Sequence, residues 1–88
     1  MKISRILYHS TFNRYIKKFD DNFRIILRER VEIFRNNCFD PCLKTHKLHG
    51  KHKGYYSFSV DYSYRVIFQI LEEGVAIFID IGDHSIYQ

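Results

Sequence analysis

A chain of 88 residues, of which 45% are hydrophobic and 17% aromatic, builds one small domain over residues 1–88 and leaves no room for a second. No apolar run approaches the roughly 18 residues that span a bilayer, and the N-terminal residues lack the apolar region of a secretion signal, so we expect a cytoplasmic protein. The net charge of +4 is modest but unevenly distributed.

The N-terminal half of the chain predicts a strand followed by a helix. Residues 2–8 alternate loosely between apolar and polar side chains, as in a strand, and Ser10 is the expected N-cap of the helix. From Thr11 onward, apolar side chains recur at helical spacing. Asp20 and Asp21 end this helix, and their negative charge favours the start of a second one.

The second predicted helix is amphipathic and ends at Asn36 and Asn37. Its charged residues cover one side, and we interpret them as a solvated face. The apolar stripe on the other side, which we expect in the core, consists of Phe23, Ile26, Leu27, Val31 and Phe34.

The C-terminal half predicts an antiparallel meander of strands over Tyr55–Val60, Tyr64–Leu71 and Val75–Ile81, with a two-residue turn at Glu73-Gly74. Alternation along these strands predicts one nearly unbroken apolar face, which the helices cover. This face consists of Tyr56, Phe58, Val60, Tyr64, Val66, Phe68, Ile70, Val75, Ile77, Ile79 and Ile81.

The opposite face of the meander mixes polar and apolar side chains, so we expect it to be open to a ligand. Pairing through the two turns sets Arg65 opposite Ser59 on one side and opposite Gly82 on the other. The C-terminal segment with His84 and Tyr87 therefore leaves the sheet beside Arg65. The other side chains expected on this face are Tyr55, Ser57, Ile67, Gln69, Phe78 and Asp80.

A basic, histidine-rich segment precedes the meander, within a predicted loop over Cys38–Lys53. It contains no acid and attracts phosphate backbones, anionic surfaces or an acidic protein partner. Its cations and histidines, for which we expect salt-dependent RNA or ribosome binding, are Lys44, His46, Lys47, His49, Lys51, His52 and Lys53.

Cys38, Cys42 and His46 have a spacing that zinc sites also use. A closed structural site needs four ligands, and Pro41 interrupts the spacing. We therefore interpret both cysteines as free cytosolic thiols and expect no metal.

Arg65 and His84 together suggest the chemistry of RNA cleavage. A mid-strand arginine binds phosphate or carboxylate through bidentate hydrogen bonds; the alternatives are an ordinary exposed strand residue or a pair with Asp80. In RNA cleavage the 2′-hydroxyl attacks the adjacent phosphate without a metal; Arg65 then stabilises the phosphorane and His84 protonates the leaving 5′-oxygen. Tyr87 can stack on a base. The general base is one of the loop histidines, His46, His49 or His52.

Three motifs, in this order along the chain, resemble motifs of the RelE/ParE superfamily of bacterial type II toxins. They are the loop His46-x-Leu48-x-Gly50-x-x-Lys53-Gly54-Tyr55, the strand Tyr64-Arg65-Val66-Ile67-Phe68 and the terminal segment Ile81-Gly82-Asp83-His84-Ser85-Ile86-Tyr87. The resemblance covers essentially the whole chain. It implies a RelE-like α+β fold in the order βααβββ, an antiparallel sheet with two N-terminal helices packed on one face.

The resemblance also implies a function, that of the RelE, YafQ and YoeB branches. Their members are ribosome-dependent mRNA endonucleases, held inactive by a cognate antitoxin. The implied partners are this antitoxin and mRNA in the ribosomal A site, with no cofactor and no membrane. The residues with implied catalytic or substrate-contacting roles are His46, Arg65, His84 and Tyr87. The alternatives are a ParE-like inhibitor of DNA gyrase and a catalytically inactive antitoxin-binding module.

Overall fold

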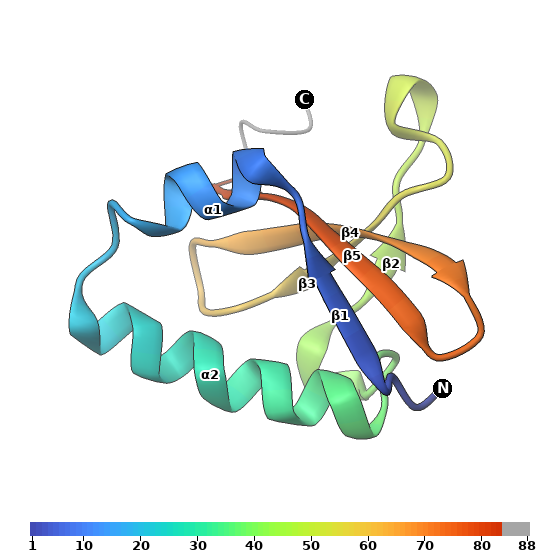
Figure 1. Cartoon of the computed structure of the whole chain (residues 1–88), viewed down its shortest axis with the longest axis horizontal. Helices are drawn as coiled ribbons and strands as arrows, with labels where there is room; N and C mark the ends of the chain where they lie inside the picture. Colours follow the sequence, from blue (N-terminus) through green and yellow to red (C-terminus); the bar gives the residue numbers. More distant parts are fainter. Residues whose placement is uncertain (84–88) are drawn as a thin grey trace.

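Within residues 1–83, which the structure describes apart from the side chain of His52, five strands form one mixed sheet against which helices pack (Figure 1). The structure is a computed structural model. The strand order is β1-β5-β4-β3-β2. None of the helices in this part of the chain is long and apolar enough to cross a membrane. The elements are β1 (Arg5–Tyr8), α1 (Ser10–Ile16), α2 (Asp21–Asn36), η1 (Pro41–Leu43), β2 (His46–Lys47), η2 (Gly50–His52), β3 (Tyr56–Ser59), β4 (Arg65–Glu72) and β5 (Val75–Gly82).

The predicted meander is confirmed, because β4 pairs antiparallel with both β3 and β5. The sheet is mixed rather than purely antiparallel, since β1 pairs parallel with β5 and sets Arg5 opposite Val75 (Figure 1). The predicted turn at Glu73-Gly74 forms with a φ of 78° at Gly74, which glycine adopts without strain. The Gly74 carbonyl accepts hydrogen bonds from the N–H groups of Ser4 and Arg5, at 2.9 and 3.1 Å, so this turn joins β1 to the meander.

Both predicted helices form, and a side chain caps each N-terminus. The prediction of Ser10 as the first cap is wrong: Ser10 is the first helical residue of α1, and the Thr11 N–H donates to Nδ1 of His9 at 3.1 Å. A neutral imidazole nitrogen accepts this bond as a cap oxygen does. At the start of α2 the carboxylate of Asp20 accepts a hydrogen bond from the Phe23 N–H at 2.9 Å.

Aromatic rings from both helices and the sheet meet in the core. Phe34 of α2 is fully buried, and its ring centroid lies 5.1, 4.9 and 5.2 Å from those of Phe58, Phe68 and Phe78. Phe12 of α1 reaches the same cluster, 5.5 Å from Phe78. These tilted and edge-on arrangements are the ones that aromatic pairs prefer, so the cluster fixes both helices to the sheet.

The predicted apolar stripe of α2 is confirmed except at one position. Phe23, Leu27 and Phe34 are buried, and Val31 packs against them partly buried. Ile26 remains 36% exposed, so its placement in the core was wrong. It lies one residue, about 100°, from Leu27 and therefore at the margin of the stripe.

The predicted face of β5 is wrong over most of the strand. Ala76 and Phe78 are fully buried, whereas Ile77 and Ile79, which we expected in the core, are only partly buried. Two bulges explain the difference, because the register shifts once at Leu71 of β4 and once at Ile79 of β5. A single extra residue exchanges the two faces of a strand.

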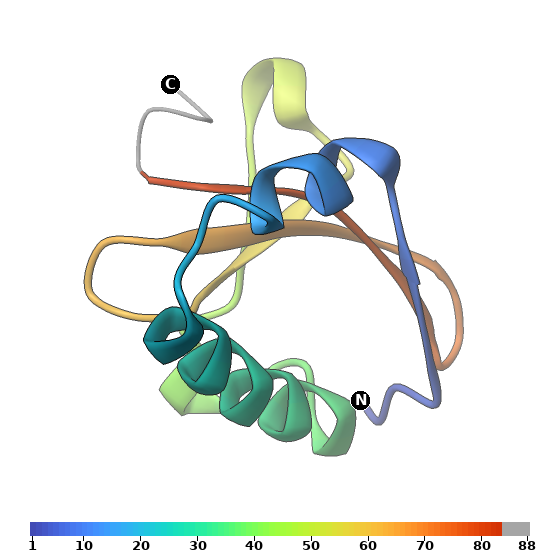
Figure 2. The same ribbon diagram turned by 60° about the vertical axis from the view of Figure 1, so that its left-hand side comes forward.

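The face of the sheet opposite the helices is only partly open. Ser57 and Ile67, which we expected on an open face, are buried, yet neither belongs to the helix-side core. Leu48 is buried as well, and its N–H donates to the Tyr55 carbonyl at 2.9 Å. The segment Lys44–Lys53, which we call the basic loop, thus contains the edge strand β2 and continues, through η2, on the side of the sheet away from α2 (Figures 1 and 2).

Candidate functional site

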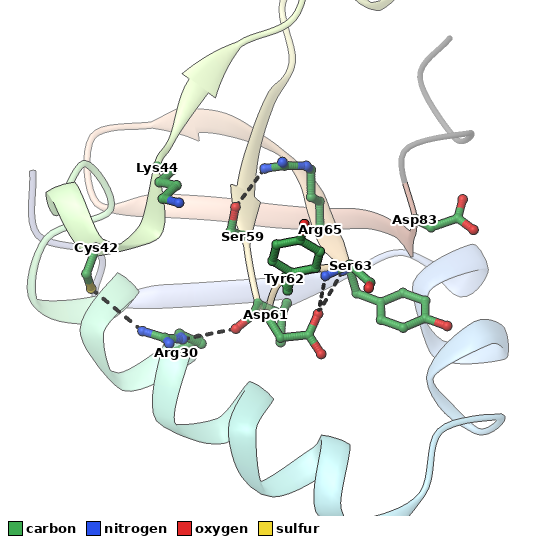
Figure 3. A pocket seen from close by; sticks show the side chains of 11 residues that line it. Arg30, Cys42, Lys44, Ser59, Asp61, Tyr62, Ser63, Arg65 and Asp83 are labelled. Carbon is green, nitrogen blue, oxygen red and sulfur yellow. Dashed lines mark hydrogen bonds between the residues drawn. The ribbon is translucent and has the colours of Figure 1, made fainter.

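A cleft with a volume of about 1020 Å³ opens beside the start of β4 (Figure 3). Its walls come from α2, η1, the turn between β3 and β4, and the end of β5, which are distant in sequence. The lining residues are Arg30, Cys42, Lys44, Ser59, Val60, Asp61, Tyr62, Ser63, Tyr64, Arg65 and Asp83.

Arg65 is the first residue of β4 and lies opposite Ser59 and Gly82, as the turns predicted. Its Nη1 donates a hydrogen bond of 2.6 Å to Ser59 Oγ. Its Nε is buried and has no hydrogen-bond partner in the described part of the chain. A buried donor without a partner costs about 1–3 kcal/mol, a cost that an acceptor such as a phosphate oxygen would offset if it reached Nε. The carboxylate of Asp80 instead accepts a hydrogen bond from the Ile81 N–H at 2.8 Å.

Lys44 contributes a second cation to the cleft from an unfavourable backbone conformation. It follows η1 with a φ of 54°, the left-handed region, and is the single non-glycine residue with positive φ in the described chain. A lysine in this conformation costs roughly 1–2 kcal/mol. Strain of this kind is concentrated at functional sites, and here it places Lys44 in the wall of the cleft.

The third cation of the cleft, Arg30, was missed in the sequence analysis. Its Nε donates to the Val60 carbonyl at 3.0 Å, so it joins α2 to the end of β3 (Figure 3). We had assigned it to the solvated face of the helix. The sequence did contain a signal, because Arg30 follows Leu27 by three residues and precedes Phe34 by four, which places it on the core-facing side.

His46 of β2 lies opposite Ser57 and is not among the residues that line the cleft. Its Nδ1 is 3.1 Å from the Lys44 carbonyl, and its Nε2 is 3.4 Å from Ser57 Oγ. A carbonyl only accepts, so neutral His46 carries its proton on Nδ1, and the Nε2 lone pair faces the buried Ser57 hydroxyl. The basic nitrogen of His46 is therefore engaged within the sheet.

The other cations and histidines of the basic loop whose side chains the structure describes are exposed to solvent and do not line the cleft. Of the predicted site residues, the structure brings Lys44 and Arg65 together in the cleft. His84 and Tyr87 lie outside the described residues, as does the side chain of His52. The exposed members are His46, Lys47, His49, Lys51 and Lys53.

The two cysteines are chemically different. Cys38 is fully buried, and burial raises the pKa of its thiol. Cys42 is exposed in the wall of the cleft, where hydrogen bonding to Asp40 raises the pKa of its thiol, while the Cys42 N–H lowers the pKa of the Asp40 carboxyl. Both thiols are neutral at neutral pH, which disfavours thiolate chemistry. Among the described residues, no group of three or more His, Cys, Asp or Glu side chains is placed to hold a metal ion.

No protein-family model matches the sequence, and no curated protein is significantly similar to it. Solved structures do share its fold. A point mutant of YafQ from E. coli is 21% identical with a TM-score of 0.74, covering 92% of this chain and 93% of that chain. The YoeB/ParE toxin from Agrobacterium tumefaciens is 16% identical with a TM-score of 0.74, covering 96% and 99%.

One of the similar solved structures is a toxin–antitoxin complex. A chain of the E. coli DinJ–YafQ toxin–antitoxin complex is 22% identical with a TM-score of 0.71, covering 98% of this chain and 97% of that chain. These neighbours are members of the RelE/ParE-like toxin superfamily. The chain therefore has a RelE-like α+β fold, and the resemblance predicted from the sequence is confirmed at the level of the fold.

Proposed function

We propose that this chain is the toxin of a type II toxin–antitoxin system and acts in the cytoplasm as a ribosome-dependent mRNA endonuclease. The observation that carries the proposal is Arg65, an arginine with a buried unpartnered donor in the wall of a cleft, on a RelE-like fold. Lys44 and Arg30 add positive charge to the same cleft. This arrangement suits a phosphate that gains negative charge during the reaction.

In the proposed reaction the 2′-hydroxyl of the substrate loses its proton and attacks the adjacent phosphate. The P–O5′ bond breaks, leaving a 2′,3′-cyclic phosphate and a 5′-hydroxyl. Arg65 donates hydrogen bonds to the phosphorane, His84 protonates the leaving oxygen, and Tyr87 stacks on a neighbouring base. No metal ion takes part.

On the resemblance alone, we propose His46 as the first candidate for the general base; it is not among the residues that line the cleft. Its Nε2 must turn away from Ser57 before it can accept the proton of the 2′-hydroxyl. This rotation breaks the weak 3.4 Å contact to the Ser57 hydroxyl and the 3.1 Å hydrogen bond from Nδ1 to the Lys44 carbonyl. His49 and His52 are the other histidines of the basic loop that can take this role.

The proposed macromolecular partners are a cognate antitoxin and mRNA on the ribosome. The fold supports the first, because the E. coli DinJ–YafQ structure is a toxin–antitoxin complex. The exposed cations of the basic loop support the second, because they are free to neutralise phosphates of mRNA or ribosomal RNA. The RNA-binding residues that we propose are Lys44, Lys47, His49, Lys51, His52 and Lys53.

The test is tightly controlled expression in bacteria with mapping of mRNA 5′ ends. Wild type is expected to arrest growth and create new ends within coding regions, whereas Arg65→Ala and His84→Ala are expected to do neither. Arg28→Ala, an exposed arginine on α2 outside the cleft, is the matched control and should remain toxic. Growth arrest without new ends, together with DNA-damage signalling, would contradict the proposal and favour gyrase inhibition. Antitoxin binding without growth arrest would favour an inactive binding module.

A further inference from the structure

Tyr62 is an aromatic residue that the fold leaves unburied. It lies in the turn between β3 and β4, it is 97% exposed, and it lines the same cleft as Arg65 (Figure 3). Turn positions usually carry small polar residues, because an exposed aromatic ring gains no packing energy there. Folding therefore gives no reason for a tyrosine at this position.

The turn that carries Tyr62 is held rigidly by hydrogen bonds on both sides. The Asp61 carboxylate accepts from the N–H groups of Ser63 and Tyr64, at 2.9 and 2.8 Å. The Val60 N–H donates to the Tyr64 carbonyl at 2.9 Å, and Arg30 donates to the Val60 carbonyl. The backbone of the tip is thus fixed before any ligand arrives.

A second tyrosine two residues further along anchors the turn. The Tyr64 ring makes edge-on contacts with Phe19 and Phe23, at centroid distances of 5.0 and 5.3 Å. Because Tyr64 packs against α2 and against the segment that joins α1 to α2, Tyr62 projects from a fixed base into solvent. Binding to such a ring freezes few side-chain torsions, which favours affinity.

The charges around the cleft point to the ligand. Arg30, Lys44 and Arg65 are cations, and Asp61 and Asp83 are the acids that line it. The Asp61 carboxylate is already hydrogen-bonded to two backbone N–H groups, which disperse its charge. An exposed aromatic face beside several cations is the combination that binds single-stranded RNA, with phosphates on the cations and a base on the ring.

We propose that Tyr62 is a base-stacking residue for single-stranded RNA and that it orders the nucleotide beside the phosphate held by Arg65. The inference rests on the proposed function for its substrate class. It adds a contact on the turn between β3 and β4, separate from the one assigned to Tyr87. Tyr62 then contributes to substrate positioning and tolerates different bases, because every base presents a stacking face.

The experiment uses the full chain and a short single-stranded RNA in which 2′-O-methyl groups block cleavage. 2-Aminopurine replaces one base at a time, because its fluorescence is quenched on stacking. Wild type is expected to quench the probe at one or two adjacent positions. Tyr62→Ala should remove the quench at one position, should leave any quench at a base stacked on Tyr87, and should weaken binding by about tenfold, within the range measured for single base–aromatic stacks.

Two further variants of Tyr62 separate stacking from simple apolar contact. Tyr62→Phe should keep both affinity and quench, whereas Tyr62→Leu should behave like Tyr62→Ala. Arg65→Ala should weaken binding but keep the quench at saturating protein. Since Tyr62 is almost fully exposed, all these variants at position 62 are expected to fold, which urea denaturation verifies.

The possible failures are distinguishable. If the chain cleaves no mRNA but the quench depends on Tyr62, the proposed function is wrong and the stacking role remains. If the chain does cleave mRNA while Tyr62→Ala leaves affinity and quench unchanged, the stacking role alone is wrong. Absence of quenching by wild type at every position also overturns it, as does a Tyr62→Ala variant that loses antitoxin binding and keeps RNA binding.

Discussion

Removal of the Ser59 hydroxyl tests whether the position of Arg65 matters for activity. Ser59 Oγ accepts a 2.6 Å hydrogen bond from Nη1 of Arg65, across the strand pair β3–β4. Ser59→Ala removes this acceptor without adding bulk. The guanidinium then lacks a partner at Nη1 in addition to Nε, which already has none in the described part of the chain.

The expected magnitude follows from the kind of bond that is lost. Hydrogen bonds to charged groups contribute about 1.5–3 kcal/mol. Both Ser59 and Arg65 are half-buried, so water replaces part of this energy and we expect about 1.5 kcal/mol. If this energy holds Arg65 in its reactive position, kcat/KM falls about tenfold, since about 1.4 kcal/mol corresponds to a factor of ten.

The assay is cleavage of a defined mRNA on programmed ribosomes under single-turnover conditions. Ser59→Thr retains a hydroxyl and suits a strand, so it is the matched control and should keep most of the activity. A structural readout accompanies the rates: the Nε–H signal of Arg65 in a nitrogen-15 spectrum should exchange faster with water in Ser59→Ala than in wild type or Ser59→Thr.

One result would refute the reasoning. If Arg65→Ala abolishes cleavage while Ser59→Ala cleaves like wild type with an unchanged Nε–H signal, Ser59 does not position the guanidinium. A double variant completes the cycle through stability: Ser59→Ala should lower the free energy of unfolding by less in an Arg65→Ala background than in wild type, because the two residues share one interaction.

Three further predictions concern the cleft, the basic loop and the core. Lys44→Gly relieves the left-handed strain and should raise the free energy of unfolding by about 1 kcal/mol while weakening RNA binding; a loss of stability in urea contradicts this. Alanine at both Lys47 and Lys51 should reduce the slope of log affinity against log salt by about 1.4, or about 0.7 per lost phosphate contact, and an unchanged slope contradicts phosphate binding. Phe34→Ala should cost about 3–5 kcal/mol of stability because the ring is fully buried, and a cost below about 1 kcal/mol would mean that the core refills.

Where periodicity was strong, the sequence predicted the fold well. The stripe of α2 and the three strands of the meander repeat over enough residues to fix their type, and the turn at Glu73-Gly74 fixes the order of pairing. The cap of α1 was missed because histidine is a less common cap than serine, and His9 and Ser10 are adjacent polar residues where the helix begins. A local choice between adjacent polar residues depends on side-chain geometry that spacing does not encode.

Short elements and long-range pairing were not predictable in the same way. The strand β2 has only two residues, His46 and Lys47, and leaves no periodic signal in the loop that contains it. The parallel pairing of β1 with β5 joins segments at opposite ends of the chain, Arg5 and Val75 among their partners. Nothing local in either segment indicates that partner. Likewise, Arg30 and Lys44 enter the cleft only because α2 and η1 pack beside the turn after β3.

The predicted position of Arg65 is correct although the predicted face of β5 is wrong, and the two bulges explain both results. The extra residue at Leu71 displaces the register by one, so that Phe78 instead of Ile79 pairs with Phe68. The extra residue at Ile79 lies on the other strand and restores the original register before Arg65. One inserted residue on each strand cancels at the end of the ladder, and between the two insertions the side chains of β5 lie on the opposite face from the predicted one, whereas those of β4 keep the predicted face. The bulged segment thereby delivers Phe78 to the aromatic core, and the restored register sets Arg65 opposite Gly82 beside the cleft. The same pair of strands thus delivers Phe78 to the core in the shifted register and holds Arg65 at the cleft in the restored one.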